Sequence, residues 1–330
     1  MKRVPIIFGA VVLLAAAAYW LRPSAPLEAV YCAERKVALW NRVAQVREPV
    51  ATLAYGEKLG ILERRKENVR VRTDSGAEGW IDQKYLMTAE LWQRGQDLRD
   101  KSASLAPQAR GTTKVSTNVR VEPGREGPRL YQFSSGVQVD VLERRVVEWT
   151  PRAPASGATS PSEAESPTES GTGAVSSAFP EKRREDWLLV RGIGVDGGVS
   201  GWVLGRFLAM DYPAPLRDYA AGIRFLAWHE LTATLSAEGP RPTYVAAGVQ
   251  GAEGQPCDFT LLRVYSWNPR RLRYETAYVE SALCGRLPLD VQRSADITQE
   301  ASFRFANVAP KGIETREYRS RHNAVRRVRK

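Results

Sequence analysis

The residues that could carry nucleophilic or acid–base chemistry are few: the chain has two histidines, His229 and His322, and three cysteines, Cys32, Cys257 and Cys284. A cysteine peptidase needs a thiol beside an activating histidine, and a catalytic zinc needs clustered histidine ligands. His229 lies in an apolar run typical of a strand, His322 lies in a basic stretch, and the two are far apart in sequence. Paired carboxylates could hydrolyse a glycoside, but 37 acidic residues make chance pairs common. The sequence therefore predicts no enzyme, no metal site and no cofactor.

The two C-terminal cysteines flank a predicted hairpin, and we expect a disulfide between them. If the hairpin loop covers residues 268–273, Trp267 faces Tyr274 and Cys257 lies opposite Cys284. The paired Cα atoms are then about 4.5–5.5 Å apart, which suits a bridge. A loop two residues shorter makes the thiols diagonal neighbours, and bridging then needs a β-bulge. The alternative is two free thiols that serve as small apolar core residues.

The N-terminal segment has the pattern of a membrane anchor. Lys2 and Arg3 precede an uncharged apolar run over residues 4–21, which as a helix is about 27 Å long and matches a hydrocarbon core. The basic residues favour a cytoplasmic N-terminus and place the rest of the chain beyond the membrane. The alternative is a cleaved signal peptide, with small residues at 16–18. In both cases the main part of the chain is predicted to face the periplasm or cell envelope.

The chain is strongly basic, with 48 lysines and arginines against 37 acidic residues and a net charge of +11. Such a surface favours phospholipid headgroups, acidic wall polymers or nucleic acid. Because export is predicted, we expect a cell-wall polymer or an envelope protein as partner, besides the membrane, and no nucleic acid. The C-terminal tail is predicted to bind anionic surfaces through Arg319, Arg321, Arg326, Arg327, Arg329 and Lys330. A solvated terminal strand whose charges only aid solubility is the alternative.

The chain contains an internal repeat. Residues 56–65 recur as residues 136–145, both ending in Leu-Glu-Arg-Arg, and residues 79–86 recur as residues 201–208, both beginning with Gly-Trp. The second copy is longer because residues 150–180, rich in Ser, Pro, Ala, Gly, Thr and Glu, are inserted between its strands. Such a composition buries too little apolar surface to offset its ordering entropy, so we expect a disordered loop.

The repeated residues resemble the bacterial SH3-type (SH3b) family, over roughly residues 29–90 and 112–212. The second copy carries Asn118-Val119-Arg120-Val121-Glu122-Pro123, Trp187-Leu188-Leu189-Val190, Gly201-Trp202-Val203 and Phe207-Leu208. The first copy keeps Gly79-Trp80-Ile81 and Tyr85-Leu86, but it has Ala38-Leu39-Trp40 where the family has Asn-Val-Arg. This departure weakens the expectation of ligand binding by the first copy more than the expectation of its fold.

The resemblance implies two small, partly open β-barrels that serve as binding modules for wall components or peptides. Aromatic residues of both copies are candidates for a groove that holds an extended peptide or glycan. They are Trp40, Trp80, Tyr85, Tyr131, Trp202 and Phe207. The alternative is that these rings complete the core of a barrel with few large side chains.

The expected fold is mainly β: two SH3-like barrels and a mostly antiparallel β domain follow the N-terminal transmembrane helix. The predicted segments are an anchor at 1–27, a first barrel at 28–90, a helical connector at 91–111, a second barrel at 112–212, a β-rich domain at 213–312 and a basic tail at 313–330. The predicted function is non-enzymatic binding of cell-wall peptide or glycan by the tandem modules. A scaffold that docks other envelope proteins is the alternative, and a wall-associated hydrolase is a weaker one.

Overall fold

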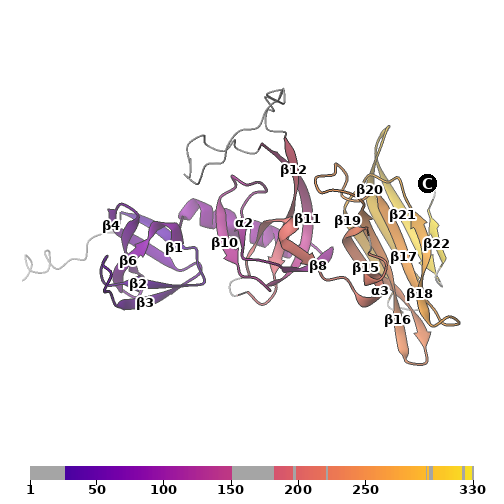
Figure 1. Ribbon diagram of the computed structural model, residues 1–330, viewed down its shortest axis with the longest axis horizontal. Coiled ribbons are helices and arrows are strands. Elements are labelled where there is room, and N and C mark those ends of the chain that lie inside the picture. The colour runs from indigo at the N-terminus through magenta and orange to yellow at the C-terminus, as the bar shows by residue number, and fades with distance from the viewer. Residues whose placement is uncertain are drawn as a thin grey trace, which may run out of the picture. The chain divides into compact units, whose positions relative to one another are not determined.

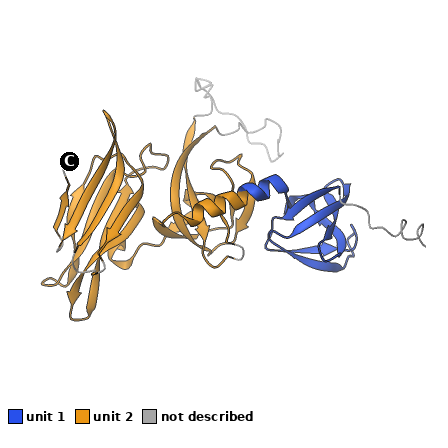
Figure 2. Ribbon diagram, turned by 180° about the vertical axis from the view of Figure 1, so that it is seen from behind, with its two compact units in different colours: residues 1–94 blue, residues 95–330 orange. Residues whose placement is uncertain are grey.

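The computed structural model describes residues 27–150, 182–195, 198–220, 222–294, 296, 300–321 and 324–328 (Figure 1). The apolar run at 4–21, the insertion at 151–180, His322, Arg329 and Lys330 lie outside the described residues. Among the helices that are described, none is long and apolar enough to cross a membrane. The chain divides into two compact units, residues 1–94 and 95–330 (Figure 2).

The first unit contains a seven-stranded antiparallel sheet with the order β3-β2-β6-β5-β4-β1-β7. Its elements are β1 (Glu28–Cys32), β2 (Lys36–Trp40), β3 (Pro49–Ala54), β4 (Lys58–Arg65), β5 (Asn68–Thr73), β6 (Glu78–Asp82), the 3₁₀ turn η1 (Gln83–Tyr85) and β7 (Leu86–Thr88). Leu53 of β3 and Val30 of β1 share one buried core. In a flat sheet these strands would lie about 24 Å apart. The sheet therefore closes around its core, and we call it the first barrel.

The second sheet repeats this arrangement with the order β10-β9-β13-β12-β11-β8-β14. Its elements are β8 (Ala109–Thr113), β9 (Thr117–Arg120), β10 (Arg129–Phe133), β11 (Gln138–Trp149), β12 (Arg183–Gly192), β13 (Ser200–Leu204), η2 (Gly205–Phe207) and β14 (Leu208–Met210). Each strand takes the place of the strand seven numbers before it. Both sheets also carry a register shift at the repeated segment, between Ile61 and Glu63 and between Val141 and Glu143. We call this sheet, residues 109–210, the second barrel.

Helix α2 (Ala89–Ala103) follows the first barrel, where the sequence predicts a polar helix. In the first unit, Trp92 stacks on Tyr31 with ring centroids 5.0 Å apart. It also fills the space above Gly56, where a Cβ atom would come within 2.4 Å of the Trp92 ring. In the second unit, Leu98 packs against the core of the second barrel. Strand β8 begins at Ala109, inside the segment predicted as a connector.

Two four-stranded antiparallel sheets complete the second unit. They have the orders β15-β16-β17-β18 and β19-β20-β21-β22. The elements are α3 (Ala214–Arg217), β15 (Arg224–Ser236), β16 (Gly239–Val249), β17 (Leu261–Asn268), β18 (Arg273–Glu280), β19 (Gly285–Arg293), β20 (Glu300–Ala309), β21 (Gly312–Arg321) and β22 (Ala324–Arg327). The segment predicted as a basic tail from residue 313 onward thus forms β21 and β22, two strands of the last sheet.

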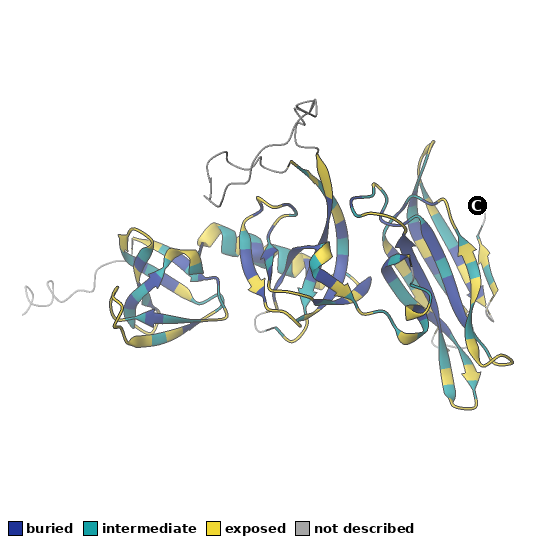
Figure 3. Ribbon diagram, in the orientation of Figure 1, coloured by how far each residue is buried: buried dark blue, intermediate teal, exposed yellow. Residues whose placement is uncertain are grey.

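These two sheets pack face to face, because one buried cluster contains side chains of both. Strand alternation explains this: Phe303 and Phe305 point inward from β20 and stack on Tyr318 of β21, with centroids 4.8 Å and 5.8 Å away. In Figure 3 buried residues occupy the middle of these strands, and exposed residues gather towards the strand ends and turns. We call this part, residues 224–327, the sandwich.

The predicted disulfide between Cys257 and Cys284 is confirmed, with Cα atoms 4.9 Å apart. Trp267 faces Tyr274, as a loop over residues 268–273 predicts. The strands are shorter than expected, however: β17 begins at Leu261 and a bulge shifts the register next to Tyr265. The cysteines therefore lie beyond the ladder, in the segments that enter β17 and β19. Cys32 is buried and free, and burial raises the pKa of its thiol to about 11.

Candidate functional site

A groove on the first barrel brings together three of the six aromatic candidates. Trp40 ends β2, Trp80 lies in β6, and the two residues face each other across the strands. Tyr85 belongs to the turn η1 that follows β6, so the chain returns it to the same groove. All three rings are half-buried, and the groove that they line has a volume of about 330 Å³. The groove thus offers aromatic surface to solvent instead of closing over it.

A loop over residues 41–48 forms one wall of this groove. Its two ends are joined by Asn41, whose backbone N–H donates to the Glu48 carbonyl at 3.0 Å and whose side-chain oxygen accepts from the Glu48 N–H at 3.1 Å. Val43 and Val46 of the loop are 49% and 82% exposed. Single exposed valines are ordinary, but Val43 lines the same groove as the two half-buried tryptophans, which extends the apolar surface.

Positive charge surrounds the rings. The Arg47 guanidinium lies 4.2 Å from the centre of Trp40, and the Lys84 ammonium lies 4.9 Å from the centre of Tyr85. Lys36 and Arg42 also line the groove, and neither forms an ion pair with any residue that the structure describes. These four cations face one acidic side chain of the lining, Asp82. The groove is therefore suited to a negatively charged ligand.

The single carboxylate of the groove is already paired. Lys84 donates to Asp82 from its ammonium at 2.7 Å and from its backbone N–H at 2.9 Å. The hydrogen bonds from Lys84 lower the pKa of Asp82, and the bond to Asp82 raises the pKa of Lys84. Both groups therefore stay charged over the physiological pH range, and Lys36, Arg42 and Arg47 carry the charge that is left uncompensated.

The aromatic candidates of the second barrel belong to its core. Trp202 is 7% exposed and Tyr131 is 5% exposed, while Phe207 packs against the cluster that contains Trp202. These three rings thus lie in or against the core of the second barrel, and ligand binding by them stays a prediction. Arg120 lies opposite Trp202 in the same register in which Trp40 lies opposite Trp80.

The loop of the second barrel is held by ion pairs. The Arg120 guanidinium donates to the Gly127 carbonyl within this loop. Arg125 donates to both oxygens of Glu185, at 2.7 Å and 3.0 Å, and Arg206 donates to the same carboxylate at 2.8 Å. Burial would raise the pKa of Glu185, but the bonds and charges of the two arginines outweigh it and lower the pKa. The place of the first barrel's groove is thus occupied by a salt-bridge network.

The histidine that the structure describes is neutral and lies on a strand of the sandwich. His229 lies on β15 with a buried Nε2 atom that has no hydrogen-bond partner. Burial and the charge of Arg293 lower its pKa to about 4, so the ring is neutral at physiological pH. No group of three or more metal-ligating side chains occurs among the described residues.

The basic candidates at the C-terminus lie on strands. Arg319 of β21 lies opposite Arg326 of β22, and both are exposed. Neither these two nor Arg321 forms an ion pair with a described residue. Arg327 differs, because it lies 3.7 Å from Glu314. Like charges directly opposite on neighbouring strands repel, so this face keeps an uncompensated positive charge.

Sequence reasoning missed the cations of the groove, Lys36, Arg42 and Arg47. A signal was present, because the loop after Trp40 reads Asn-Arg-Val-Ala-Gln-Val-Arg, with an arginine near each end. Which side of the barrel the loop faces depends on the pairing of β2 with β6, and this pairing is not readable from the sequence.

The sequence matches no protein-family model and no curated protein. Among solved structures, the chain is similar to the crystal structure of an NlpC/P60 family protein from Bacillus cereus ATCC 10987. The identity is 8%, the similarity covers 77% of this chain and 94% of that chain, and the TM-score is 0.22. A TM-score of this size carries no argument about fold or activity.

Proposed function

We propose that the chain is a non-enzymatic protein of the cell envelope whose first barrel binds an extended, negatively charged ligand, a peptide or glycan of the cell wall. The observation that supports this most is the facing pair Trp40 and Trp80, with the unpaired cations Lys36 and Arg42 beside it. Half-buried tryptophans supply flat apolar surface on which a sugar ring or a peptide can lie. The cations add attraction for the carboxylates of such a ligand.

The proposed location outside the cytoplasm rests on two independent features. The apolar run at residues 4–21 follows Lys2 and Arg3, the order expected of an exported chain. The disulfide Cys257–Cys284 is of a kind that forms and persists in oxidising compartments. Alkaline phosphatase fused after the C-terminus is expected to be active, and an inactive fusion would contradict the topology.

Sedimentation with purified peptidoglycan tests the proposed binding. The detergent-solubilised chain should co-sediment, and the double variant Trp40→Ala, Trp80→Ala should stay in the supernatant. Trp267→Ala is a matched control, since Trp267 is also half-buried and also has a guanidinium over its ring, that of Arg241 at 4.8 Å. Equal sedimentation of all three proteins would refute the groove as the binding site.

A scaffold for other envelope proteins remains the second candidate. Absence of binding to peptidoglycan, together with a protein partner recovered by crosslinking in intact cells, would favour it.

The uncompensated arginines of the sandwich favour an additional contact with anionic lipid. Arg319, Arg321 and Arg326 lie close together on β21 and β22, and each basic residue near an acidic membrane gains about 1 kcal/mol. Replacing all three with Gln should weaken co-sedimentation with phosphatidylglycerol vesicles at low salt. Replacing Arg270, Arg271 and Arg273 instead, near the turn between β17 and β18, should leave the binding unchanged. An equal loss of vesicle binding in both triple variants would show that net charge alone accounts for the binding.

A further inference from the structure

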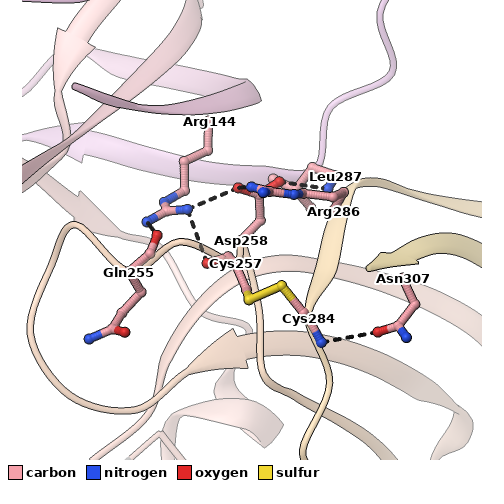
Figure 4. The surroundings of a disulfide bond; sticks show 8 residues. All are labelled: Arg144, Gln255, Cys257, Asp258, Cys284, Arg286, Leu287 and Asn307. Carbon is pink, nitrogen blue, oxygen red and sulfur yellow. Dashed lines mark hydrogen bonds and ion pairs between the residues drawn. A yellow bond between two sulfur atoms is a disulfide. The ribbon is translucent and has the colours of Figure 1, made fainter. Parts of the chain in front are cut away.

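The side chain of Arg144 joins the second barrel to the sandwich. It lies on β11 and is fully buried. Its Nε and Nη2 atoms donate to Asp186 of the second barrel at 3.1 Å and 2.5 Å. From the sandwich side it meets Asp258 at 2.9 Å and the carbonyls of Gln255 and Cys257 at 2.8 Å and 3.1 Å (Figure 4). These five bonds match the five N–H donors of a guanidinium, so the buried charge is fully satisfied.

The groups of the sandwich that accept hydrogen bonds from Arg144 all come from one irregular segment, residues 254–258, between β16 and β17. Gly254 donates its N–H to Asp186 at 3.0 Å and has a φ of +80°. A Cβ atom at this position would come within 2.4 Å of Arg184, so glycine is required. Asp186 is held from its other oxygen by Arg224 at 2.8 Å. The segment has no strand partner of its own over residues 254–257.

The disulfide ties this segment to the second sheet of the sandwich. Cys284 donates its N–H to the Asn307 side chain at 3.0 Å and accepts from Val308 at 2.8 Å, both on β20 (Figure 4). The connection from β20 to Arg144 therefore runs through the hydrogen bonds of Cys284 and the disulfide to Cys257, whose carbonyl accepts from Arg144. Both cysteines are half-buried. A cavity of about 790 Å³ opens beside them, lined among others by Pro256, Asp258, Arg286 and Leu287.

We propose that the Cys257–Cys284 disulfide is a redox-sensitive latch that keeps the sandwich docked on the second barrel through Arg144. The reductant is a dithiol. One thiolate attacks a sulfur of the bridge and forms a mixed disulfide, and the second thiol of the reductant then displaces the protein sulfur. The bridge takes up two electrons and two protons to give two cysteine thiols, and the dithiol is oxidised to a disulfide.

Reduction frees residues 254–257 from their covalent tie, while the backbone bonds of Asp258 and Phe259 to Gly285 remain. If the freed segment withdraws, Arg144 loses the carbonyls of Gln255 and Cys257 and becomes an incompletely satisfied buried charge. Such a charge is strongly unfavourable, so the contact is either complete or opens to water. The latch thus acts as a two-state element, and its opening leaves the core of the sandwich intact.

Hydrogen exchange on the full chain, before and after native reduction with dithiothreitol, tests the latch. The reporter amides are Gly254, Leu289 and Trp228, because the last two donate to the side-chain oxygen and the backbone carbonyl of Gln108, which directly precedes β8 of the second barrel. Their exchange should accelerate at least about tenfold, as expected for local opening, while amides of β20 and β21 stay unchanged. Alkylation should mark Cys257 and Cys284 but not the buried Cys32. Unchanged exchange at the three amides, or equal acceleration throughout the sandwich, would overturn the proposal.

The variant Arg144→Met separates a latch from a purely local disulfide. It removes the buried guanidinium and keeps the disulfide. The three reporter amides should therefore exchange fast before reduction and respond little to dithiothreitol. The equivalent variant Arg64→Met in the first barrel should keep the full response. Arg144→Lys, which retains a charge but loses the fork of donors, serves if the methionine variant does not fold. A full response to reduction in either Arg144 variant would contradict coupling through this side chain.

Discussion

Where β2 of the first barrel carries Trp40, β9 of the second barrel carries Arg120, and each residue faces the closing tryptophan of its own barrel. In the first barrel the two rings stay half-buried and line a basic groove. In the second barrel the arginine turns into the neighbouring loop, and Trp202 sinks into the core. The exchange of Trp40 for Arg120 therefore accompanies the change from an open basic groove in the first barrel to a closed surface in the second.

A second pair of equivalent residues shows the same division of roles. Arg64 of the first barrel has a side chain 44% exposed and pairs with Glu28 on the surface. Arg144 of the second barrel, at the same place in the repeat, is fully buried between Asp186 and Asp258. The second barrel thus uses its equivalent surface to hold the sandwich.

The largest expected effect separates these two arginines. Arg144→Ala leaves two carboxylates buried without their partner and should destabilise the second unit by about 3–5 kcal/mol. Arg64→Ala breaks only an exposed pair and should cost about 0–1 kcal/mol. Urea unfolding followed by hydrogen exchange, which resolves each barrel, measures both. Similar losses for the two variants would mean that the copies do not differ in this respect.

The closing tryptophans should differ in the same direction. Trp202→Ala removes a buried ring and should cost about 3–5 kcal/mol, whereas Trp80→Ala, at a half-exposed position, should cost about 1 kcal/mol. The same exchange experiment compares them. A large loss for Trp80→Ala would identify its ring as a core residue and would weaken the case for the groove.

The carboxylates of the two barrels should respond differently to pH. The folded pKa of Glu185 lies below its unfolded value, so its stabilising effect is present above about pH 4.3 and is lost as the pH falls through the folded pKa. Glu185→Gln should therefore cost about 1–3 kcal/mol at pH 7 and progressively less in acid. The pKa of Glu78 in the first barrel is also lowered, by its hydrogen bonds with Arg72 and Arg70, but these pairs are more exposed, so Glu78→Gln should cost less at pH 7. A pH-independent cost for Glu185→Gln would show that packing, not charge, stabilises this site.

The smallest expected effect concerns the free cations of the groove. Replacing Lys36 and Arg42 with Gln should weaken binding to peptidoglycan about twofold to fivefold at low salt, and less at high salt, because exposed charges are screened. Exchanging Lys58 and Arg64, two exposed cations of the same barrel that do not line the groove, for Gln is the control. A salt-independent loss would indicate that the two side chains act by contact alone.

Local pattern was enough to predict much of the fold. The repeat predicted two sheets with matching elements, and the hairpin register at Trp267 and Tyr274 predicted the disulfide. The basic residues after 313 were read as a tail because their charge hides the inward side chains Tyr318 and Ser320, which are buried. Dense charge indicates exposure to solvent, but a strand at the edge of a sheet can carry exposed charged side chains on one face and buried side chains on the other.

The candidate site was less readable, for a physical reason. All six aromatic candidates have similar local surroundings in the sequence, but their burial depends on which residue faces them across the barrel. Trp40 counted against binding as a departure from the SH3b pattern, although it is this residue that widens the aromatic surface. No local pattern marks Arg144 as buried, because its partner Asp258 is far away in the sequence and contacts it only where the sandwich packs on the second barrel.

The variant Trp40→Arg tests the comparison of the barrels most directly, because it gives the first barrel the residue that the second one has. Titration of the detergent-solubilised chain with solubilised peptidoglycan fragments would compare this variant with the wild type. Loss of a central aromatic contact should weaken binding at least about tenfold, while the reverse change Arg120→Trp leaves the Glu185 network in place and should create no new site. Wild-type affinity of Trp40→Arg would contradict the assignment of ligand binding to the first barrel.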